Sequence, residues 1–304
     1  MRIITSLATS AVSAAALALA LAAPSGAVAA DRAAASGAGT GTGTGQHAAA
    51  TTLAEQRRIT AYWTPARMKS AIPRENVYVP RKGKPGPGGG SATAVQVPAS
   101  PLFGKVFFTE KGLNYVCSGT VTASSSNSLV TTAGHCVNEG PGAYVSNFAF
   151  VPKYENGSRP YGTFTAATLV TTEQWRTSGD FDHDIGFATM NPLNGKTLVG
   201  AVGSAYPIAF NKGYNLTFDA YGYPAATPYD GQTLWRCSGP TTKDTRGSTD
   251  NRLPCSMTGG SSGGGWITGG YLNSLNSFGY RGEKNVMYGP YFGTVEQALY
   301  QTVD

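Results

Sequence analysis

The chain has 304 residues, of which 41% are hydrophobic, 13% are charged and 40 are glycine. This supplies a substantial apolar core and favours an all-β chain with many turns. The net charge of +6 comes from residues 31–95, which hold nine Lys and Arg against three Asp and Glu, whereas residues 96–304 hold thirteen against fourteen. The body is near neutral and has no RNA-binding signature, so we do not expect a nucleic acid partner.

The first thirty residues are organised like an export signal. Arg2 gives a positive start, residues 7–23 are apolar, and the small residues AVAA precede Asp31. A membrane anchor is the alternative, but the apolar segment is short, rich in alanine and not followed by a cluster of stop-transfer charges. We therefore expect a signal peptide over residues 1–30, a secreted extracellular protein, and no membrane contact after cleavage.

Residues 31–97 are expected to be a leader or pro-segment that is partly disordered. Residues 31–50 are of low complexity, and residues 51–72 contain short helical turns. The sequence RKGKPGPGGGSATA, residues 81–94, is typical of a flexible linker. We expect the precursor, a zymogen, to be cleaved near this linker.

From about residue 98 the residue pattern changes to short runs of Val, Phe, Tyr and Thr separated by Gly, Asn and Pro. Such runs at this spacing predict the strands of a sandwich or barrel. The predicted strands lie within residues 104–109, 114–123, 128–134, 147–152, 162–170, 184–190, 215–224, 232–239, 265–268 and 275–280.

Only the C-terminal segment is clearly helical by its pattern. Thr294 and Gln297 have the spacing of a capping box, and Val295, Leu299 and Val303 fall on one face. We expect a short C-terminal helix.

The four cysteines form two local pairs in the sequence, Cys117 with Cys136 and Cys237 with Cys255. Three pairings are possible, and an exported chain with an even count favours disulfides, of which local ones are the simplest. Zinc is the alternative, but there is no C-x-x-C and the histidines are scattered. We expect no metal and no cofactor.

The stretch SMTGGSSGGGW, residues 256–266, holds two adjacent serines, Ser261 and Ser262, among five glycines. An α/β-hydrolase needs a histidine after its serine, and none follows His183; a subtilisin needs an aspartate before its histidine, and only Asp31 precedes His135. The remaining order of catalytic residues is His, Asp, Ser.

The segments around these residues resemble the motifs of a known protein family. TTAGHC (131–136), DHDIGFATM (182–190) and GGSSGGG (259–265) resemble the three catalytic motifs of the trypsin/chymotrypsin-like serine proteases. With YGYP (221–224), the sequence is most similar to the bacterial glutamyl-endopeptidase-like (V8-like) branch. The resemblance implies two six-stranded antiparallel β-barrels in a domain over residues 98–304.

On this resemblance the first barrel covers about residues 98–192 and the second about residues 193–304. His135 would be the general base, because an imidazole titrates near the working pH. Asp184 would orient it, with Asp182 as the alternative, and Ser262 would be the nucleophile.

The glycine run has a role in this arrangement. The backbone N–H groups of Gly260 and Ser262 would form the oxyanion hole, in a turn that glycine adopts at low steric cost. A flexible Gly/Ser linker is the alternative, but a tryptophan and an apolar strand follow at once.

The sequence departs from many family members in three places. Ser261 stands where they carry an aspartate that pairs with a new amino terminus, and no I-V-G-G cleavage motif is present. Ser256 stands where trypsin-like members carry an acid. We expect the substrate pocket to include Ser256, Met257, Asn276 and Ser277.

These features together predict a secreted, monomeric serine endopeptidase that acts on proteins or peptides through an acyl-enzyme. The alternative is a protease-like binding protein without catalytic turnover, and an esterase on the same scaffold is a third possibility.

Overall fold

The computed structural model describes residues 45–74, 77–78 and 92–304, and for residues 77–78 only the backbone. The expected signal peptide and most of the expected linker lie outside these residues. No helix in the described part of the chain is long and apolar enough to cross a membrane.

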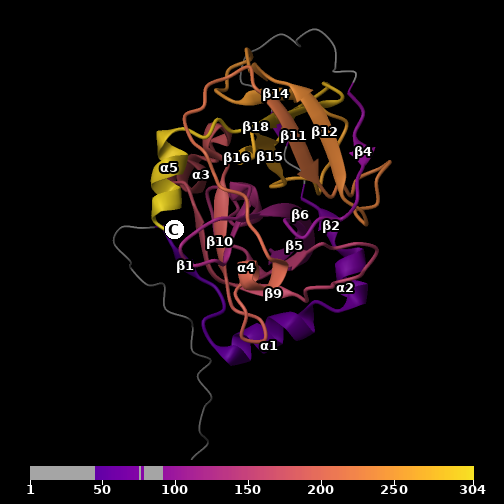
Figure 1. The fold of residues 1–304 in the computed structure, drawn as a ribbon, viewed down its shortest axis with the longest axis vertical. Helices are drawn as coiled ribbons and strands as arrows, with labels where there is room; N and C mark the ends of the chain where they lie inside the picture. The colour runs from indigo at the N-terminus through magenta and orange to yellow at the C-terminus, as the bar shows by residue number, and fades with distance from the viewer. Residues whose placement is uncertain (1–44, 75–76, 79–91) are drawn as a thin grey trace, which may run out of the picture. The chain divides into compact units, whose positions relative to one another are not determined.

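A closed barrel of six antiparallel strands forms the first half of the fold (Figure 1). The sheet closes because β8 pairs with β9 on one side and with β5 on the other. Its interior is filled by large apolar side chains such as Val106, Phe150 and Phe187, all fully buried. In order around the barrel the strands are β5 (Phe103–Glu110), β6 (Leu113–Thr122), β7 (Leu129–Thr132), β10 (Gly186–Met190), β9 (Phe164–Thr171) and β8 (Ser146–Pro152).

Two sheets form the second half. Phe218 and Trp266 from one sheet and Leu253 and Met287 from the other lie in one buried cluster. The all-β fold predicted from the sequence is therefore confirmed, although the second half is hydrogen-bonded as two sheets. The first sheet has the order β16 (Tyr271–Leu275), β15 (Gly265–Thr268), β11 (Thr217–Gly222), β12 (Trp235–Pro240), β4 (Val95–Gln96), and the second has the order β13 (Thr242–Lys243), β14 (Asn251–Pro254), β18 (Val286–Gly289).

The segment before residue 75 packs on the first barrel. It contains β1 (His47–Ala48), α1 (Leu53–Tyr62), α2 (Pro65–Ser70) and β2 (Ile72–Pro73). The helical turns predicted here are present. Thr52 and Glu55 form a capping box at the start of α1, and Pro65 begins α2, where its missing N–H costs nothing.

The prediction of disorder through residue 50 is wrong at its end. His47 and Ala48 pair with Leu169 and Thr168 of β9, and the His47 ring stacks on Tyr144 with centroids 4.8 Å apart. The edge of β9 provides a partner that composition alone does not reveal.

Trp63 fixes this segment to the barrel. Its side chain is 1% exposed, packs in one cluster with Phe107 and Tyr154, and donates its indole N–H to the Asn147 carbonyl at 2.6 Å. Burying a tryptophan contributes roughly 3 kcal/mol. The segment is therefore part of the folded body.

The C-terminal helix α5 spans Thr294–Gln301. Its predicted cap was one residue late, because Gly293 is the N-cap and donates its N–H to the Glu296 carboxylate at 2.8 Å. Of the three residues predicted to share one face, Leu299 and Val303 pack against the first barrel's core, whereas Val295 is not part of that cluster. Two short helices were not predicted: α3 (Glu173–Ser178) and α4 (Leu198–Val202).

Both disulfides are the local ones, Cys117–Cys136 and Cys237–Cys255. The first joins β6 to the turn after β7, and the second joins β12 to the residue after β14. Each therefore links two strands of the half in which it lies.

Candidate active site

His135 is held by a short turn at the end of β7. The 3-10 turn η1 (Gly134–Cys136) carries it, and the disulfide of Cys136 attaches this turn to β6. Gly134 has no room for a side chain, since a Cβ there would lie 2.9 Å from Asp184 Oδ1 and 2.8 Å from Thr171 Oγ1. Glycine at position 134 thus lets the Asp184 carboxylate approach the backbone of this turn closely.

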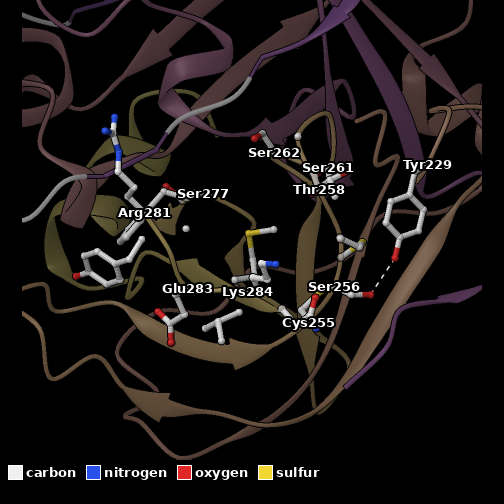
Figure 2. A pocket seen from close by; sticks show the side chains of 18 of the residues that line it. Tyr229, Cys255, Ser256, Thr258, Ser261, Ser262, Ser277, Arg281, Glu283 and Lys284 are labelled. Atoms are coloured by element: carbon white, nitrogen blue, oxygen red, sulfur yellow. Dashed lines mark hydrogen bonds between the residues drawn. The ribbon is translucent and has the colours of Figure 1, made fainter. Parts of the chain in front are cut away.

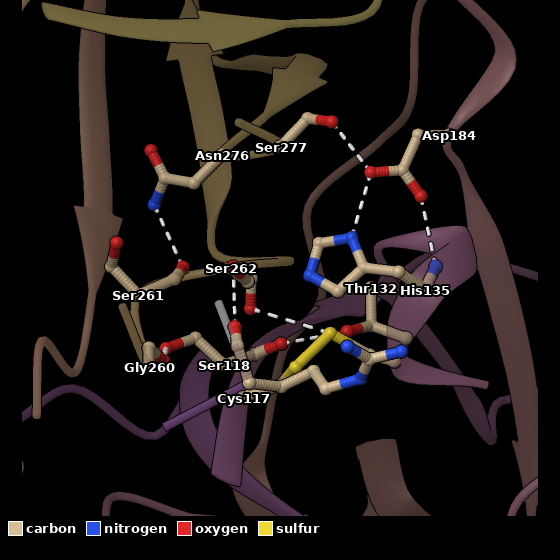
Figure 3. The surroundings of a disulfide bond; sticks show 12 residues. Cys117, Ser118, Thr132, His135, Asp184, Gly260, Ser261, Ser262, Asn276 and Ser277 are labelled. Carbon is tan, nitrogen blue, oxygen red and sulfur yellow. Dashed lines mark hydrogen bonds and ion pairs between the residues drawn. A yellow bond between two sulfur atoms is a disulfide. The ribbon is translucent and has the colours of Figure 1, made fainter. Parts of the chain in front are cut away.

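Asp184 binds His135 through both carboxylate oxygens (Figure 3). Oδ1 accepts the His135 backbone N–H at 2.8 Å, and Oδ2 lies 2.8 Å from His135 Nδ1. Both side chains are fully buried. The competing residue Asp182 lies away from the imidazole and accepts the N–H of Thr249.

Ser277 adds a third hydrogen bond to the same carboxylate. Its hydroxyl donates to Asp184 Oδ2 at 2.5 Å. The sequence placed Ser277 in the substrate pocket, and no pattern in one sequence indicated this contact, because 93 residues separate the partners.

Ser262 lies in the glycine-rich turn before β15. Figure 3 shows the imidazole of His135 between Asp184 and Ser262. His135 Nε2 is buried and has no hydrogen-bond partner among the described residues, and the Ser262 hydroxyl lies 3.5 Å from the carbonyl oxygen of Arg74. The fold thus places the candidate nucleophile, Ser262, beside the candidate base, His135. The leader contacts the serine through the Arg74 carbonyl.

The glycines around Ser262 allow close backbone packing. A Cβ on Gly263 would lie 2.1 Å from Thr132 Oγ1, and one on Gly264 would lie 2.0 Å from the Tyr221 carbonyl. Gly260 has φ +94°, a conformation that favours glycine. The backbone N–H groups of Gly260 and Ser262 have no acceptor in the described part of the chain, so both are available to an oxyanion.

Asn276 supports the glycine-rich turn around Ser262 through its side-chain hydrogen bonds. Its amide donates to the carbonyls of Ser261 at 2.9 Å and Tyr221 at 2.7 Å, and its oxygen accepts the Trp266 indole N–H at 2.7 Å. It is fully buried and is not part of the cavity lining. The pocket role predicted for Asn276 therefore does not match its position. Alternation along an extended chain points Ser277 and Asn276 in opposite directions.

A cavity of ≈ 950 Å³ opens beside Ser262 (Figure 2). Ser256, Met257 and Ser277 contribute to its lining, as the sequence predicted. Ser256 lies at one side of it, where its hydroxyl accepts the backbone N–H of Ala94 at 2.8 Å and pairs with the Tyr229 hydroxyl at 2.9 Å.

Charged residues lie at one end of the cavity. Arg281, Glu283 and Lys284 are part of its lining. Glu283 is neutralised by Arg246 at 3.0 Å and Arg252 at 3.3 Å. The two exposed cations therefore dominate that end of the cavity.

The described residues contain one cluster with the composition of a metal site, Cys117, His135 and Cys136, whose ligand atoms lie within 4.8 Å of one another. The two sulfurs are bonded to each other, so neither is a thiolate. Zinc binds the thiolate form of cysteine, and this cluster does not fit it.

His183 lies between Asp182 and Asp184 in the sequence and has its partner in the C-terminal helix. Its Nδ1 lies 2.6 Å from Glu296 Oε1 in helix α5. The hydrogen bond from the imidazole to this buried carboxylate raises the pKa of His183. It joins the loop before β10 to the C-terminal helix, which is a structural role.

Comparison with known proteins identifies the family. No family model matches the chain. Over 69% of this chain and 98% of the other, the structure matches the protease Anisep from Arthrobacter nicotinovorans, with 47% sequence identity and a TM-score of 0.67. The chain belongs to the serine proteases of the chymotrypsin fold. A thermostable serine protease, AL20, from an extremophilic microorganism matches this protease at 46% identity over 67% of this chain and 97% of the other, with a TM-score of 0.65.

Two further similarities support less about this protease. A Glu endopeptidase matches at 17% identity and a TM-score of 0.56 over 72% of this chain and 97% of the other, which shows the fold alone. The Extracellular metalloprotease of Bacillus subtilis (strain 168) is 30% identical over 84 residues, which is 28% of this protease and 26% of that protein. The match therefore spans about a quarter of the curated relative.

Proposed function

We propose that this protease is a secreted serine endopeptidase that cleaves proteins or peptides through His135, Asp184 and Ser262. His135 Nε2 takes the proton from the Ser262 hydroxyl as its oxygen attacks the scissile carbonyl carbon. The oxyanion accepts hydrogen bonds from the N–H groups of Gly260 and Ser262. The C–N bond breaks as His135 gives its proton to the leaving amine, and water then hydrolyses the acyl-enzyme by the same steps.

The observation that carries this proposal is the orientation of the imidazole. Asp184 accepts from both the backbone and Nδ1 of His135, so it fixes the tautomer and turns the other ring nitrogen toward Ser262. A buried, unpaired Nε2 is costly in a purely structural role, since buried polar atoms are nearly always hydrogen-bonded.

Secretion as a precursor is part of the proposal. The export-signal pattern of residues 1–30 and the two disulfides fit an oxidising compartment. The leader that follows would be removed after export.

The test is labelling of the secreted, processed protein with a fluorophosphonate, with Ser262→Ala and the neighbouring Ser261→Ala as matched variants. We expect the wild type and Ser261→Ala to be labelled and Ser262→Ala not to be. Absence of labelling in correctly folded, processed wild type would favour a binding protein without turnover. Cleavage of casein, compared with that of a small ester, then separates a peptidase from an esterase.

A further inference from the structure

Two short strands of the leader, β2 and β3 (Val77–Tyr78), pair with the two halves of the fold near the proposed active site. Ile72 and Pro73 of β2 run parallel to Tyr115 and Val116 of β6, and the N–H of Arg74 donates to the Val116 carbonyl at 3.1 Å. Further on, β3 runs parallel to β17 (Gly279–Tyr280). Between these two pairings, the carbonyl oxygen of Arg74 lies beside the Ser262 hydroxyl.

The leader lies over the nucleophile in a pose that does not lead to cleavage. The Ser262 hydroxyl points at the oxygen of the Arg74 carbonyl, 3.5 Å away. Neither Gly260 N–H nor Ser262 N–H donates to that oxygen among the described residues. Acyl transfer requires the reverse arrangement, with the carbonyl carbon at the hydroxyl and the oxygen at the two N–H groups.

The same segment helps to close the site. His135 is fully buried and Ser262 is 6% exposed, so neither is open to a large substrate while the leader is in place. A substrate must displace the leader at Arg74 to reach either side chain.

The side chain of Arg74 is held in a site of its own. Its Nη2 donates to Glu110 Oε1 at 3.0 Å, and its Nε lies 2.7 Å from Glu110 Oε2. The guanidinium carbon also lies 5.6 Å from the ring centroid of Tyr115. A carboxylate that takes two guanidinium nitrogens beside an aromatic ring is a recognition site for a cationic side chain.

Glu110 and Tyr115 belong to the β5–β6 hairpin and do not depend on the leader for their position. Glu110 is only 6% exposed with Arg74 bound, and departure of the leader leaves this carboxylate without its cation. Such a group favours a new basic partner.

We propose that Glu110 and Tyr115 form a subsite for a basic side chain next to the nucleophile. In the precursor, Arg74 fills this subsite and anchors the leader over Ser262; in the processed enzyme, an arginine or lysine of the substrate fills it. The proposal rests on the proposed function, since the site is a subsite only if Ser262 is the nucleophile.

The side of the scissile bond follows from the two halves of the fold. The cavity beside Ser262 is lined by the second half, whereas Glu110 and Tyr115 lie in the first. A peptide that places one side chain in the cavity and its carbonyl at Ser262 sends its next residues toward the first half. The basic residue therefore belongs on the leaving-group side.

The first experiment measures the rate at which a fluorophosphonate labels the uncleaved precursor, resolved from the processed protein by mass on a gel. We expect wild-type precursor to label far more slowly than processed protein, and Arg74→Gln and Glu110→Gln precursors to label about tenfold faster than the wild type. Arg74→Lys, which keeps the charge, should lie between. Arg67→Gln and Glu139→Gln are matched controls, because Arg67 donates to the Tyr62 carbonyl within the leader and Glu139 pairs with Lys111.

The second experiment uses processed enzyme and a casein-derived peptide that it cleaves, made with Arg or Ala at each of the two positions on the leaving-group side. We expect wild type to prefer Arg at one of these positions by about tenfold in kcat/KM, and Glu110→Gln to lose that preference. Glu139→Gln should keep it.

The outcomes separate the two proposals. If neither precursor nor processed protein is labelled, the proposed function fails. If precursor and processed protein are labelled equally fast, the enzyme stands and the blocking role of the leader is overturned. If Glu110→Gln keeps the wild-type preference for Arg, the subsite is overturned.

Discussion

The base and the nucleophile candidates are built in different ways. On the side of the first barrel, His135 is fixed by packing and by two hydrogen bonds to a fully buried carboxylate. On the side of the second half, Ser262 stands in a glycine-rich turn whose shape is set by backbone contacts and by Asn276. The base thus depends on a side-chain network, and the nucleophile depends on backbone conformation.

The largest effects should come from substitutions of the proposed catalytic residues themselves. Asp184→Asn keeps the shape of the buried side chain but favours the wrong tautomer of His135, so we expect kcat to fall about 10⁴-fold in the processed enzyme. His135→Ala should cost about 10⁶-fold. Steady-state kinetics on the substrate of the casein assay give these values, and near-UV circular dichroism checks that the fold is intact. A fall of less than about tenfold for Asp184→Asn would remove Asp184 from its role.

The second prediction tests the backbone of the nucleophile's turn with two glycines of nearly equal φ. Gly263 (φ +80°) would place a Cβ 2.1 Å from Thr132 Oγ1, whereas Gly270 (φ +83°) has nothing within 4 Å of its Cβ. We expect Gly270→Ala to cost about 1 kcal/mol of unfolding free energy, which is the strain of positive φ alone. Gly263→Ala should cost at least about 3 kcal/mol and abolish activity. Urea unfolding measures both, and equal losses would contradict the role of close packing.

The third prediction concerns the support behind the base. Ser277→Ala removes a hydrogen bond to the buried carboxylate of Asp184, and we expect kcat/KM to fall about tenfold. Ser274→Ala is the matched control, because Ser274 is also buried but donates to the Pro290 carbonyl. A loss that is equal in the two variants would assign Ser277 a role in packing only.

The smallest predicted effect is a pH dependence of stability away from the reacting groups. Burial, with the nearby charges of Asp182 and Asp184, raises the pKa of Asp250, whose side chain is fully buried. The unfolded chain releases this proton near about pH 4 while the folded chain keeps it, so Asp250 lowers stability as pH rises above that value.

Asp250→Asn removes that dependence. We expect its melting temperature to exceed that of the wild type by a few degrees at neutral pH, and the two to converge below about pH 4. Differential scanning calorimetry across this range is the test, with Asp219→Asn, a 43% exposed side chain, as the control. Parallel curves for wild type and Asp250→Asn would contradict the account.

The residues proposed for catalysis could be found from the sequence because their signals are local. His135 stands beside a cysteine, Asp184 opens an apolar strand, and Ser262 lies within a glycine run, in an order that few folds allow. The disulfides and most strands of the first barrel were predicted from equally local patterns.

The remaining features depend on contacts between distant residues. Arg74 and Glu110 are 36 residues apart, and Ser277 and Asp184 are 93 apart, so no spacing rule joins either pair. Helices α3 and α4 have six and five residues, too short for an amphipathic period to stand out. Strands β14 and β18, each of four residues, were also not predicted.

The most direct test of the account is the position of the covalent adduct. After fluorophosphonate labelling of processed wild-type protein, proteolytic mapping by mass spectrometry should place the adduct on Ser262 and leave the adjacent Ser261 unmodified. Denaturing the protein before labelling should abolish the adduct, because His135 then no longer lies beside the serine. An adduct on Ser261, or one on Ser262 that forms equally well in denatured protein, would contradict the central claim.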